Sequence, residues 1–177
     1  VYRSTDGGQS WSLVQRLGEA VRVWSLVNLG NGVVLAGTSF NAEVYRSTDW
    51  GQSWRLVQQL QQLGSEEYVY AFADLGDGVV LAGTGYEAYV YRSTNRGLSW
   101  SFVQWLGSES EVRSLVNLGD GVVLAGTRPN GQIYRSTDGG QSWSFVQRLG
   151  SALGVYSLAT VEVTNLPPVA NAGPDQQ

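Results

Sequence analysis

The sequence contains no cysteine, histidine, methionine or lysine among its 177 residues. Without cysteine and histidine, the chain has no disulfide, no thiolate or imidazole metal site and no Cys–His or Ser–His nucleophile pair. All eleven basic residues are arginines, and the formal net charge of −4 argues against a nucleic-acid partner. No apolar run approaches the roughly 20 residues that span a bilayer, so no membrane insertion is expected.

A segment of eight residues recurs four times and identifies the chain as a repeat array. It reads Ser-Thr-Asp-Gly-Gly-Gln-Ser-Trp at 4–11 and returns in similar form at 47–54, 93–100 and 136–143. The copies begin 43, 46 and 43 residues apart, which is the spacing of a four-stranded propeller blade. No segment has helical periodicity, so the chain is expected to be all-β.

Between these segments, apolar and polar residues alternate with a period of two, and turn residues separate the runs. The first module predicts strands over 23–29, 33–38 and 44–47, and a fourth strand begins at the tryptophan of each eight-residue segment. Glycines on both sides of Asn31, Asp77 and Asp120 supply the positive φ angles that a tight hairpin between the first two strands requires.

In such an antiparallel module, the connections alternate between two rims. The rim with the first and third connections is nearly identical between modules, whereas the other rim varies. The variable loops are 39–42, 85–88 and 128–131 within modules, and 19–20, 64–67 and 108–111 between them. The extra three residues of the longest period belong to this rim, at 59–63. Variation on one rim indicates a binding face, although drift at solvated loops accounts for it equally well.

The pattern Ser-x-Asp-x-Gly-x-x-Trp resembles the Asp-box, or BNR, repeat of sialidases, sortilin-type receptors, family 74 xyloglucan hydrolases and photosystem assembly factors. The wider frame, Val-x-Ser-Leu followed by Leu-Ala-Gly-Thr and Val-Tyr-Arg-Ser-Thr-Asp, resembles the last two most closely and covers residues 1 to about 160. The resemblance implies a β-propeller in which the box is a hairpin turn without a catalytic role. The box residues are Ser4, Asp6, Gly8, Trp11, Ser47, Asp49, Gly51, Trp54, Ser93, Asn95, Gly97, Trp100, Ser136, Asp138, Gly140 and Trp143.

The chemistry of the box suits a structural turn. Its aspartate can accept backbone N–H bonds within the turn, its glycine allows the bend, and its tryptophan can pack between blades. Asn95 can form a similar turn without the charge. One carboxylate per turn falls well short of the roughly 6 to 8 oxygen ligands that calcium prefers, so neither a metal nor another cofactor is expected.

Two further sets of residues recur once per module. The arginines at the end of the third strand favour a structural bridge or a solvated face over a substrate-binding triad of the sialidase kind; they are Arg3, Arg46, Arg92 and Arg135. The residues at the head of the first strand would surround a channel mouth, where they could stack on sugar rings or anchor a peptide, or pack between blades. These are Trp24, Tyr70, Arg113 and Tyr156, with Tyr86 and Arg128 as contributors from the variable rim.

The carboxylates of the variable rim do not suggest catalysis. A glycosidase needs two carboxyl groups at a suitable separation, one of them protonated. The candidates lie in Ser-rich loops that we expect to be solvated; they are Glu66, Glu67, Glu109 and Glu111. No position matches the acid and base motifs of the family 74 enzymes or the Tyr–Glu pair of sialidases. The sequence therefore predicts a protein that is not an enzyme.

The repeat pattern stops before a fifth module is complete. Leu166-Pro167-Pro168 stands where the next second strand is due, and proline cannot donate to a sheet ladder. We expect half a blade, three whole blades and a lone first strand at 155–164. These either close a propeller of about four four-stranded blades or form part of a larger ring or assembly. The propeller domain is placed at 1–164. The tail, 165–177, resembles the opening of a PKD-type domain and is either a linker or an arm that docks on another subunit.

These observations favour a non-catalytic scaffold or adhesion module, extracellular or at the cell surface, within a repetitive assembly of other protein subunits or of its own copies. One alternative is a carbohydrate-binding or glycoside-hydrolase-type domain that binds glycans through Trp24, Tyr70 and Tyr156. The other is a filament subunit joined to its neighbours by exchange of the terminal strand.

Overall fold

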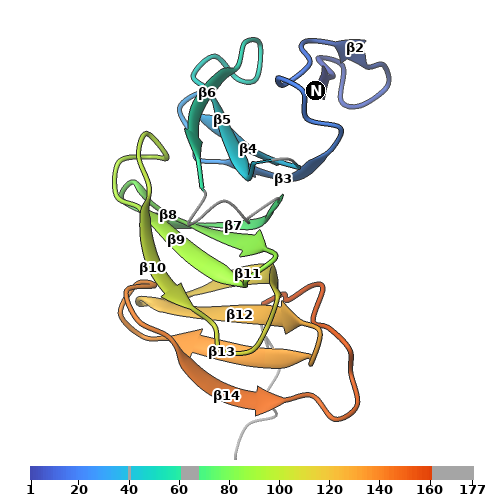
Figure 1. Cartoon of the computed structure of the whole chain (residues 1–177). Helices are drawn as coiled ribbons and strands as arrows, with labels where there is room; N and C mark the ends of the chain where they lie inside the picture. The colour runs from blue at the N-terminus through green and yellow to red at the C-terminus, as the bar shows by residue number, and fades with distance from the viewer. Residues whose placement is uncertain (40, 61–67, 161–177) are drawn as a thin grey trace, which may run out of the picture.

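The computed structural model describes residues 1–39, 41–60 and 68–160 (Figure 1). All secondary-structure elements within these residues are β-strands. They form consecutive antiparallel meanders, which confirms the expected all-β fold. No helix long and apolar enough to cross a membrane occurs in these ranges.

Three meanders of four strands form blades one, two and three. Blade one consists of β3 (Val23–Asn28), β4 (Val34–Thr38), β5 (Glu43–Ser47) and β6 (Arg55–Gln59). Blade two consists of β7 (Tyr68–Gly76), β8 (Val79–Gly85), β9 (Tyr89–Ser93) and β10 (Ser101–Trp105). Blade three consists of β11 (Glu111–Gly119), β12 (Val122–Arg128), β13 (Gln132–Ser136) and β14 (Ser144–Arg148). Before them, β1 (Tyr2–Arg3) and β2 (Ser12–Leu13) form an N-terminal hairpin that is equivalent to the last two strands of a blade.

The blades lie one after another along an open arc, with the N-terminal hairpin at one end and β14 at the other (Figure 1). Backbone pairs connect neighbouring blades, Ser39 with Tyr68 and Gly85 with Glu111. After β14, the Val155 amide donates to the Thr127 carbonyl at 3.0 Å, but residues 155–160 form no strand.

Among the described residues, no strand pairing joins the N-terminal hairpin to residues 155–160, so closure into four blades stays a prediction. Some sequence-based expectations lie wholly or partly outside the described residues. They are the insertion predicted at 59–63 beyond residue 60, the loop at 64–67, residues 161–164 of the lone first strand, the break at 166–168 and the tail at 165–177.

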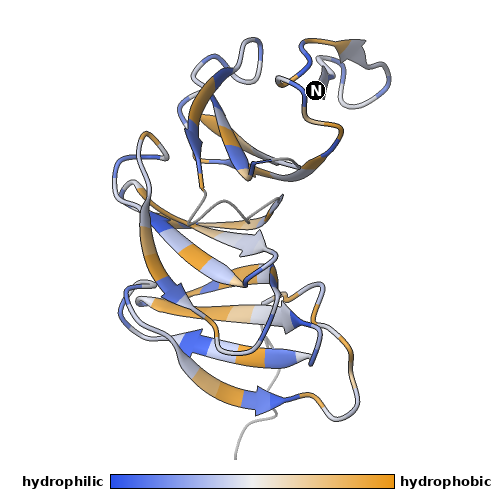
Figure 2. Cartoon of the chain, viewed as in Figure 1, coloured by the Kyte–Doolittle hydropathy of each residue, from blue (hydrophilic) through white to orange (hydrophobic). Residues whose placement is uncertain are grey.

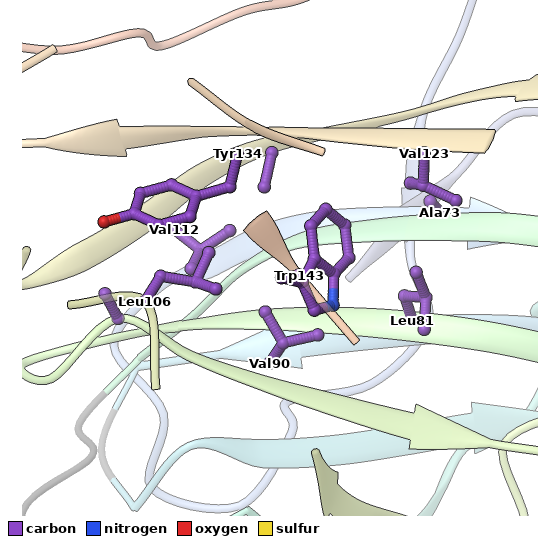
Figure 3. Close-up of a cluster of buried hydrophobic side chains, with 10 residues drawn as sticks. Ala73, Leu81, Val90, Leu106, Val112, Val123, Tyr134 and Trp143 are labelled. Carbon is purple, nitrogen blue, oxygen red and sulfur yellow. The ribbon is translucent and has the colours of Figure 1, made fainter. Parts of the chain in front are cut away.

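The hydrophobic core lies between blades. Hydrophobic and hydrophilic residues alternate along the strands (Figure 2), so each sheet can bury an apolar face against its neighbour. Trp143 of blade three lies among residues of blade two that include Leu81 and Leu106 (Figure 3). Trp100 packs in the same way on blade one, and Trp54 packs on the N-terminal hairpin. These three indoles are only 5–9% exposed.

The prediction that the box tryptophans pack between blades is wrong for Trp11. Its side chain is 63% exposed, whereas each of its three equivalents packs on the unit before it. The environment of a box tryptophan is therefore set by the neighbouring blade and not by the box itself.

Two polar contacts recur at each junction between blades. An arginine Nε donates at 2.9–3.0 Å to a carbonyl in the next box; the pairs are Arg3–Trp50, Arg46–Arg96 and Arg92–Gly139. A glutamine amide binds both the N–H and the C=O of the next box tryptophan at 3.0–3.1 Å; the pairs are Gln15–Trp54, Gln58–Trp100 and Gln104–Trp143. The recurring arginines are thus structural bridges, except Arg135, which is exposed.

The boxes close their own turns as expected. Asp49 accepts hydrogen bonds from the Ser47 hydroxyl at 2.7 Å, from the Ser53 hydroxyl at 2.6 Å, and from the N–H groups of Gln52 and Ser53 at 3.0 and 2.9 Å. Asn95 accepts the equivalent N–H bonds, but its Nδ2 donates to the Ser99 hydroxyl at 2.8 Å. The turn therefore forms with or without the charge.

These hydrogen bonds favour the ionised form of the box aspartates. The pKa of Asp6, Asp49 and Asp138 lies below the ordinary value, mainly because the hydroxyl of the serine four positions later donates to the carboxylate. For Asp138, the bond from Ser142 is the largest cause, and the pKa falls to about 2. A lowered pKa in the folded state stabilises the fold above the unfolded pKa of about 3.9. That contribution is lost as the pH falls through the folded pKa.

The variant Asp138→Asn is therefore expected to keep the turn, as Asn95 does, and to weaken the dependence of stability on pH between about pH 4 and pH 2. Urea unfolding followed by tryptophan fluorescence at several pH values measures this. The midpoint of the variant should fall less steeply with acidification than that of the wild-type protein. Equal slopes in this window would contradict the assignment to Asp138.

Candidate functional site

The predicted residues at the heads of the first strands converge on one surface. The rings of Trp24 in β3 and Tyr70 in β7 meet edge to face with centroids 5.3 Å apart. The guanidinium carbon of Arg113 in β11 lies 3.7 Å from the centre of the Tyr70 ring. It also lies 5.8 Å from the Trp24 ring and 5.6 Å from the Tyr156 ring. Side chains from three blades and from the segment after blade three therefore meet around one arginine.

A second row of residues joins this surface; it comprises Arg22, Tyr68 and Glu111. The sequence did not lead us to expect Arg22 and Tyr68 here, and it led us to expect Glu111 only as a solvated rim carboxylate. Tyr68 stacks on Tyr70 at 5.2 Å, the guanidinium carbon of Arg22 lies 5.7 Å from the centre of the Trp24 ring, and a Glu111 oxygen lies 2.6 Å from Arg113 Nε. Each residue precedes a predicted head residue by two positions, so strand alternation places it on the same face. That spacing was the signal in the sequence.

We call the set Trp24, Tyr68, Tyr70, Arg113 and Tyr156 the aromatic–arginine cluster. Of the two rim candidates, Arg128 extends this cluster, because its Nη1 lies 3.1 Å from Glu111. Tyr86 is exposed and follows Gly85, whose α-carbon packs directly against the Tyr70 ring. Among the described contacts, none joins the Tyr86 side chain to the cluster.

The surface of the cluster is apolar and basic. Trp24 is 40% exposed and Tyr156 60% exposed, so both present aromatic surface to solvent. Among the described residues, Arg22, Arg113 and Arg128 gather around the carboxylate of Glu111, on a protein whose net charge is −4. Burial raises the pKa of Tyr70 to about 12, with the charge of Arg113 acting in the opposite direction, so its hydroxyl stays protonated near neutral pH.

A groove reaches the cluster from the N-terminal hairpin. It has a volume of about 400 Å³, and its lining includes Val1, Tyr2, Val23 and Trp24. Trp24 therefore borders an open hollow and also contacts the rings of Tyr68 and Tyr70.

The expectation that the rim carboxylates are solvated is wrong for Glu109 and Glu111. Glu109 is 2% exposed and accepts hydrogen bonds from the Thr127 hydroxyl at 2.8 Å, from the Asn130 N–H at 3.1 Å and from Asn130 Nδ2 at 2.7 Å. Its loop folds back onto the turn after β12, which the local Ser-rich composition does not reveal. Both Glu111 oxygens bind arginines. Glu66 and Glu67 lie outside the described residues.

The described residues contain no group of three or more aspartate or glutamate side chains that could hold a metal ion. The cluster presents aromatic rings, arginine guanidinium groups, the Glu111 carboxylate and the hydroxyls of Tyr68, Tyr70 and Tyr156. Such groups bind ligands through stacking, cation–π contacts and hydrogen bonds.

Comparison with known proteins supports the identification of the repeat. Residues 2–13 and 134–145, which contain the first and fourth boxes, match the family model described as BNR/Asp-box repeat. No curated protein matches the sequence.

Solved structures share the fold. YCF48 from Cyanidioschyzon merolae is 18% identical, with a TM-score of 0.63 over 76% of this chain and 42% of that one. A structure of YCF48 bound to D1 peptide is 19% identical, with a TM-score of 0.59 over 70% and 38%. The GH74 xyloglucanase from Xanthomonas campestris is 22% identical, with a TM-score of 0.62 over 82% and 26%.

At these identities the likeness concerns the fold alone. The chain has a β-propeller fold built from BNR-type repeats, and it spans less than half the length of each of these proteins. The number of blades in a closed ring stays a prediction.

Proposed function

We propose that this propeller chain is a non-catalytic binding module that holds an acidic, partly apolar peptide segment of another protein on the aromatic–arginine cluster. The observation that carries this proposal is the position of Arg113, 3.7 Å from the centre of the Tyr70 ring and between the partly exposed rings of Trp24 and Tyr156.

The composition of the cluster favours a protein ligand. Tryptophan, tyrosine and arginine are the residues that most often dominate the binding energy of protein interfaces. Among the described residues of the site, the three arginines Arg22, Arg113 and Arg128 outnumber the carboxylates, and charge complementarity therefore favours an acidic partner. The groove beside Trp24 provides an approach for an extended segment. A propeller of the same fold, YCF48, has a structure with a bound peptide.

The hydrogen bonds of Glu109 and the ion pairs of Glu111 support a role of this surface in binding over a role in hydrolysis. Glu109 is buried in hydrogen bonds to Thr127 and Asn130, and Glu111 holds two arginines. Neither is available as the second carboxyl group of a glycosidase pair.

We further propose that the module serves in a scaffold or in adhesion outside the cell. The resemblance of 165–177 to the start of a PKD-type domain supports this location, although these residues lie outside the described ranges.

A fluorescence titration with two synthetic peptides tests the proposed ligand class. One peptide alternates glutamate with phenylalanine, and the other replaces each glutamate with lysine. We expect the acidic peptide to bind more tightly, and Trp24→Ala to weaken its binding by about 30-fold, the loss of about 2 kcal/mol that marks an interface hot spot. Trp105→Ala, which removes an exposed indole from β10, is the matched control.

Equal binding of both peptides, or an equal loss in the Trp24 and Trp105 variants, would contradict the proposal. Added salt provides a second readout, because it should weaken the acidic complex.

Carbohydrate remains the second candidate because Trp24 and Tyr156 expose aromatic surface on which a sugar ring could stack. A glycan array that includes plant, bacterial and sialylated oligosaccharides tests this alternative. Binding to a glycan that is lost in Trp24→Ala combined with Tyr70→Ala would favour it over the peptide. No binding across the array would leave the peptide proposal ahead.

A further inference from the structure

A polar hollow lies at the junction of blades two and three, beside the box turn between β9 and β10. It has a volume of about 340 Å³, and its lining includes Arg92, Thr94, Ser99, Ser101, Phe102 and Gln141. This volume lies at the lower end of the range of small-molecule sites, about 300–1,000 Å³. Among the described residues that line it none is acidic, whereas Glu19 and Glu43 both line a hollow beside blade one.

Arg92 provides the positive charge of this hollow. Its Nε donates to the Gly139 carbonyl at 2.9 Å, which holds the guanidinium at the junction. Within the described part of the chain, its terminal nitrogens form neither a hydrogen bond nor an ion pair. A planar guanidinium with free N–H groups fits the oxygens of an anionic ligand, of which phosphate is an example.

The box beside this hollow is the one that carries an asparagine. The N–H groups of Leu98 and Ser99 donate to Asn95 Oδ1 at 3.1 and 2.9 Å. The Asn95 amide nitrogen therefore faces the Ser99 hydroxyl, to which it donates at 2.8 Å. In the other three boxes, the equivalent serine hydroxyl donates to the aspartate at 2.6 Å. Because the Ser99 oxygen accepts a hydrogen bond here, its own hydrogen is free to donate to a ligand.

The asparagine thus changes two properties of the hollow. A carboxylate that would repel an anion is absent, and the Ser99 hydroxyl becomes a donor for a ligand and not for the turn. The hydroxyls of Thr94 and Ser101 also make no hydrogen bond to another described residue. One guanidinium and three hydroxyls therefore line the hollow with donors that have no acceptor in the described structure.

The other junctions lack this combination of residues. At the junction of blades one and two, the box carries Asp49, and Arg55 and Leu98 occupy the positions of Ser101 and Gln141. At the junction of the N-terminal hairpin and blade one, the box carries an aspartate as well. Among the three described junctions, only that of blades two and three joins the recurring arginine to a box without a carboxylate.

We propose that this hollow binds the sulfate or phosphate ester group of a small organic molecule. Arg92 supplies the charge, and the hydroxyls of Thr94, Ser99 and Ser101 donate to the ester oxygens. Hydrogen bonds to an ionised acceptor are stronger than those between neutral groups. The ring of Phe102, which is 40% exposed, provides an apolar wall for the organic part of the ligand. The site does not depend on the ligand of the aromatic–arginine cluster.

Isothermal titration calorimetry of the full 177-residue chain tests the site. The probes are glucose 6-sulfate, glucose 6-phosphate and unmodified glucose, in a buffer without sulfate or phosphate. We expect at least one ester to bind saturably with a dissociation constant of about 1 mM or lower, and glucose not to bind. Tighter binding of one ester identifies which of the two groups the hollow prefers. The absence of binding by both esters, or equal binding of glucose, would overturn the proposal.

The variant Asn95→Asp assigns the binding to this hollow. It should fold like the wild-type protein, because the other three boxes carry aspartate, and it should weaken ester binding at least about 10-fold through repulsion. Ser99→Ala, which adds no charge, should weaken binding about 5-fold through the loss of one donor. The matched control is Ser108→Asp, which makes the same change in net charge at an exposed residue of the opposite rim. Unchanged binding in Asn95→Asp, or an equal loss in Ser108→Asp, would contradict the assignment.

Discussion

Replacement of Trp100 by alanine is expected to lower the free energy of unfolding by about 3–5 kcal/mol, the cost of truncating a large buried aromatic residue. Trp100 is 6% exposed and packs with Leu35, Val44 and Leu60 of the preceding blade. The variant would leave a cavity between blades one and two, where the rigid sheets can close only in part. Chemical denaturation followed by circular dichroism measures the loss.

The equivalent residue Trp11 provides the matched control. It occupies the same box position but is exposed, so Trp11→Ala should change the stability of the dilute chain by no more than about 0.5 kcal/mol. Similar losses in the two variants would show that the box tryptophan acts within its own turn and not at the junction between blades.

The second large effect is expected at Gly140. Its φ of +80° lies in the left-handed region, and a Cβ would stand 2.6 Å from both Cδ atoms of Leu81. Gly140→Ala therefore combines a left-handed alanine, at about 1–2 kcal/mol, with overpacking of the core, at about 1–3 kcal/mol. Thermal and chemical unfolding should both show this destabilisation.

The neighbouring Gly139 separates the two contributions. Its φ is +69°, and the nearest atom to an added Cβ is Arg92 Nη2 at 3.9 Å. Trp50 and Arg96 occupy the equivalent position with φ values of 63° and 59°, so the turn accepts a side chain there. Gly139→Ala should cost only the backbone contribution. Equal destabilisation in the two variants would exclude the contact with Leu81 as the cause.

Local sequence pattern was sufficient to predict the strands and the box turns. The alternation of apolar residues predicted the order of strands in each blade, because a half-buried strand needs that period. The box hydrogen bonds connect residues at most four positions apart, as in Asp49 with Ser47 and Ser53, so they need no knowledge of the neighbouring blade. Internal comparison also located four residues of the candidate site.

Features that depend on a neighbouring blade could not be predicted in this way. Trp11 has the same box as Trp54 but a different environment, because burial is decided by the preceding unit. Glu109 is buried because its loop meets the turn at Asn130, a contact between residues 21 positions apart. Tyr68 was missed for another reason, since only the head of each strand was compared between modules and the position two residues earlier was not.

The candidate site originates in the repeat. Successive blades place equivalent positions next to one another, so Trp24, Tyr70 and Arg113 converge although they come from different blades. A change in the angle between blades would therefore alter the cluster.

Electron microscopy of the purified chain tests most directly the claim that the blades are arranged about a common axis. Averaged images should show sheets radiating from a hub, with the first strand of each blade innermost. Sheets stacked in a straight row without a hub, or density for helices, would contradict the account.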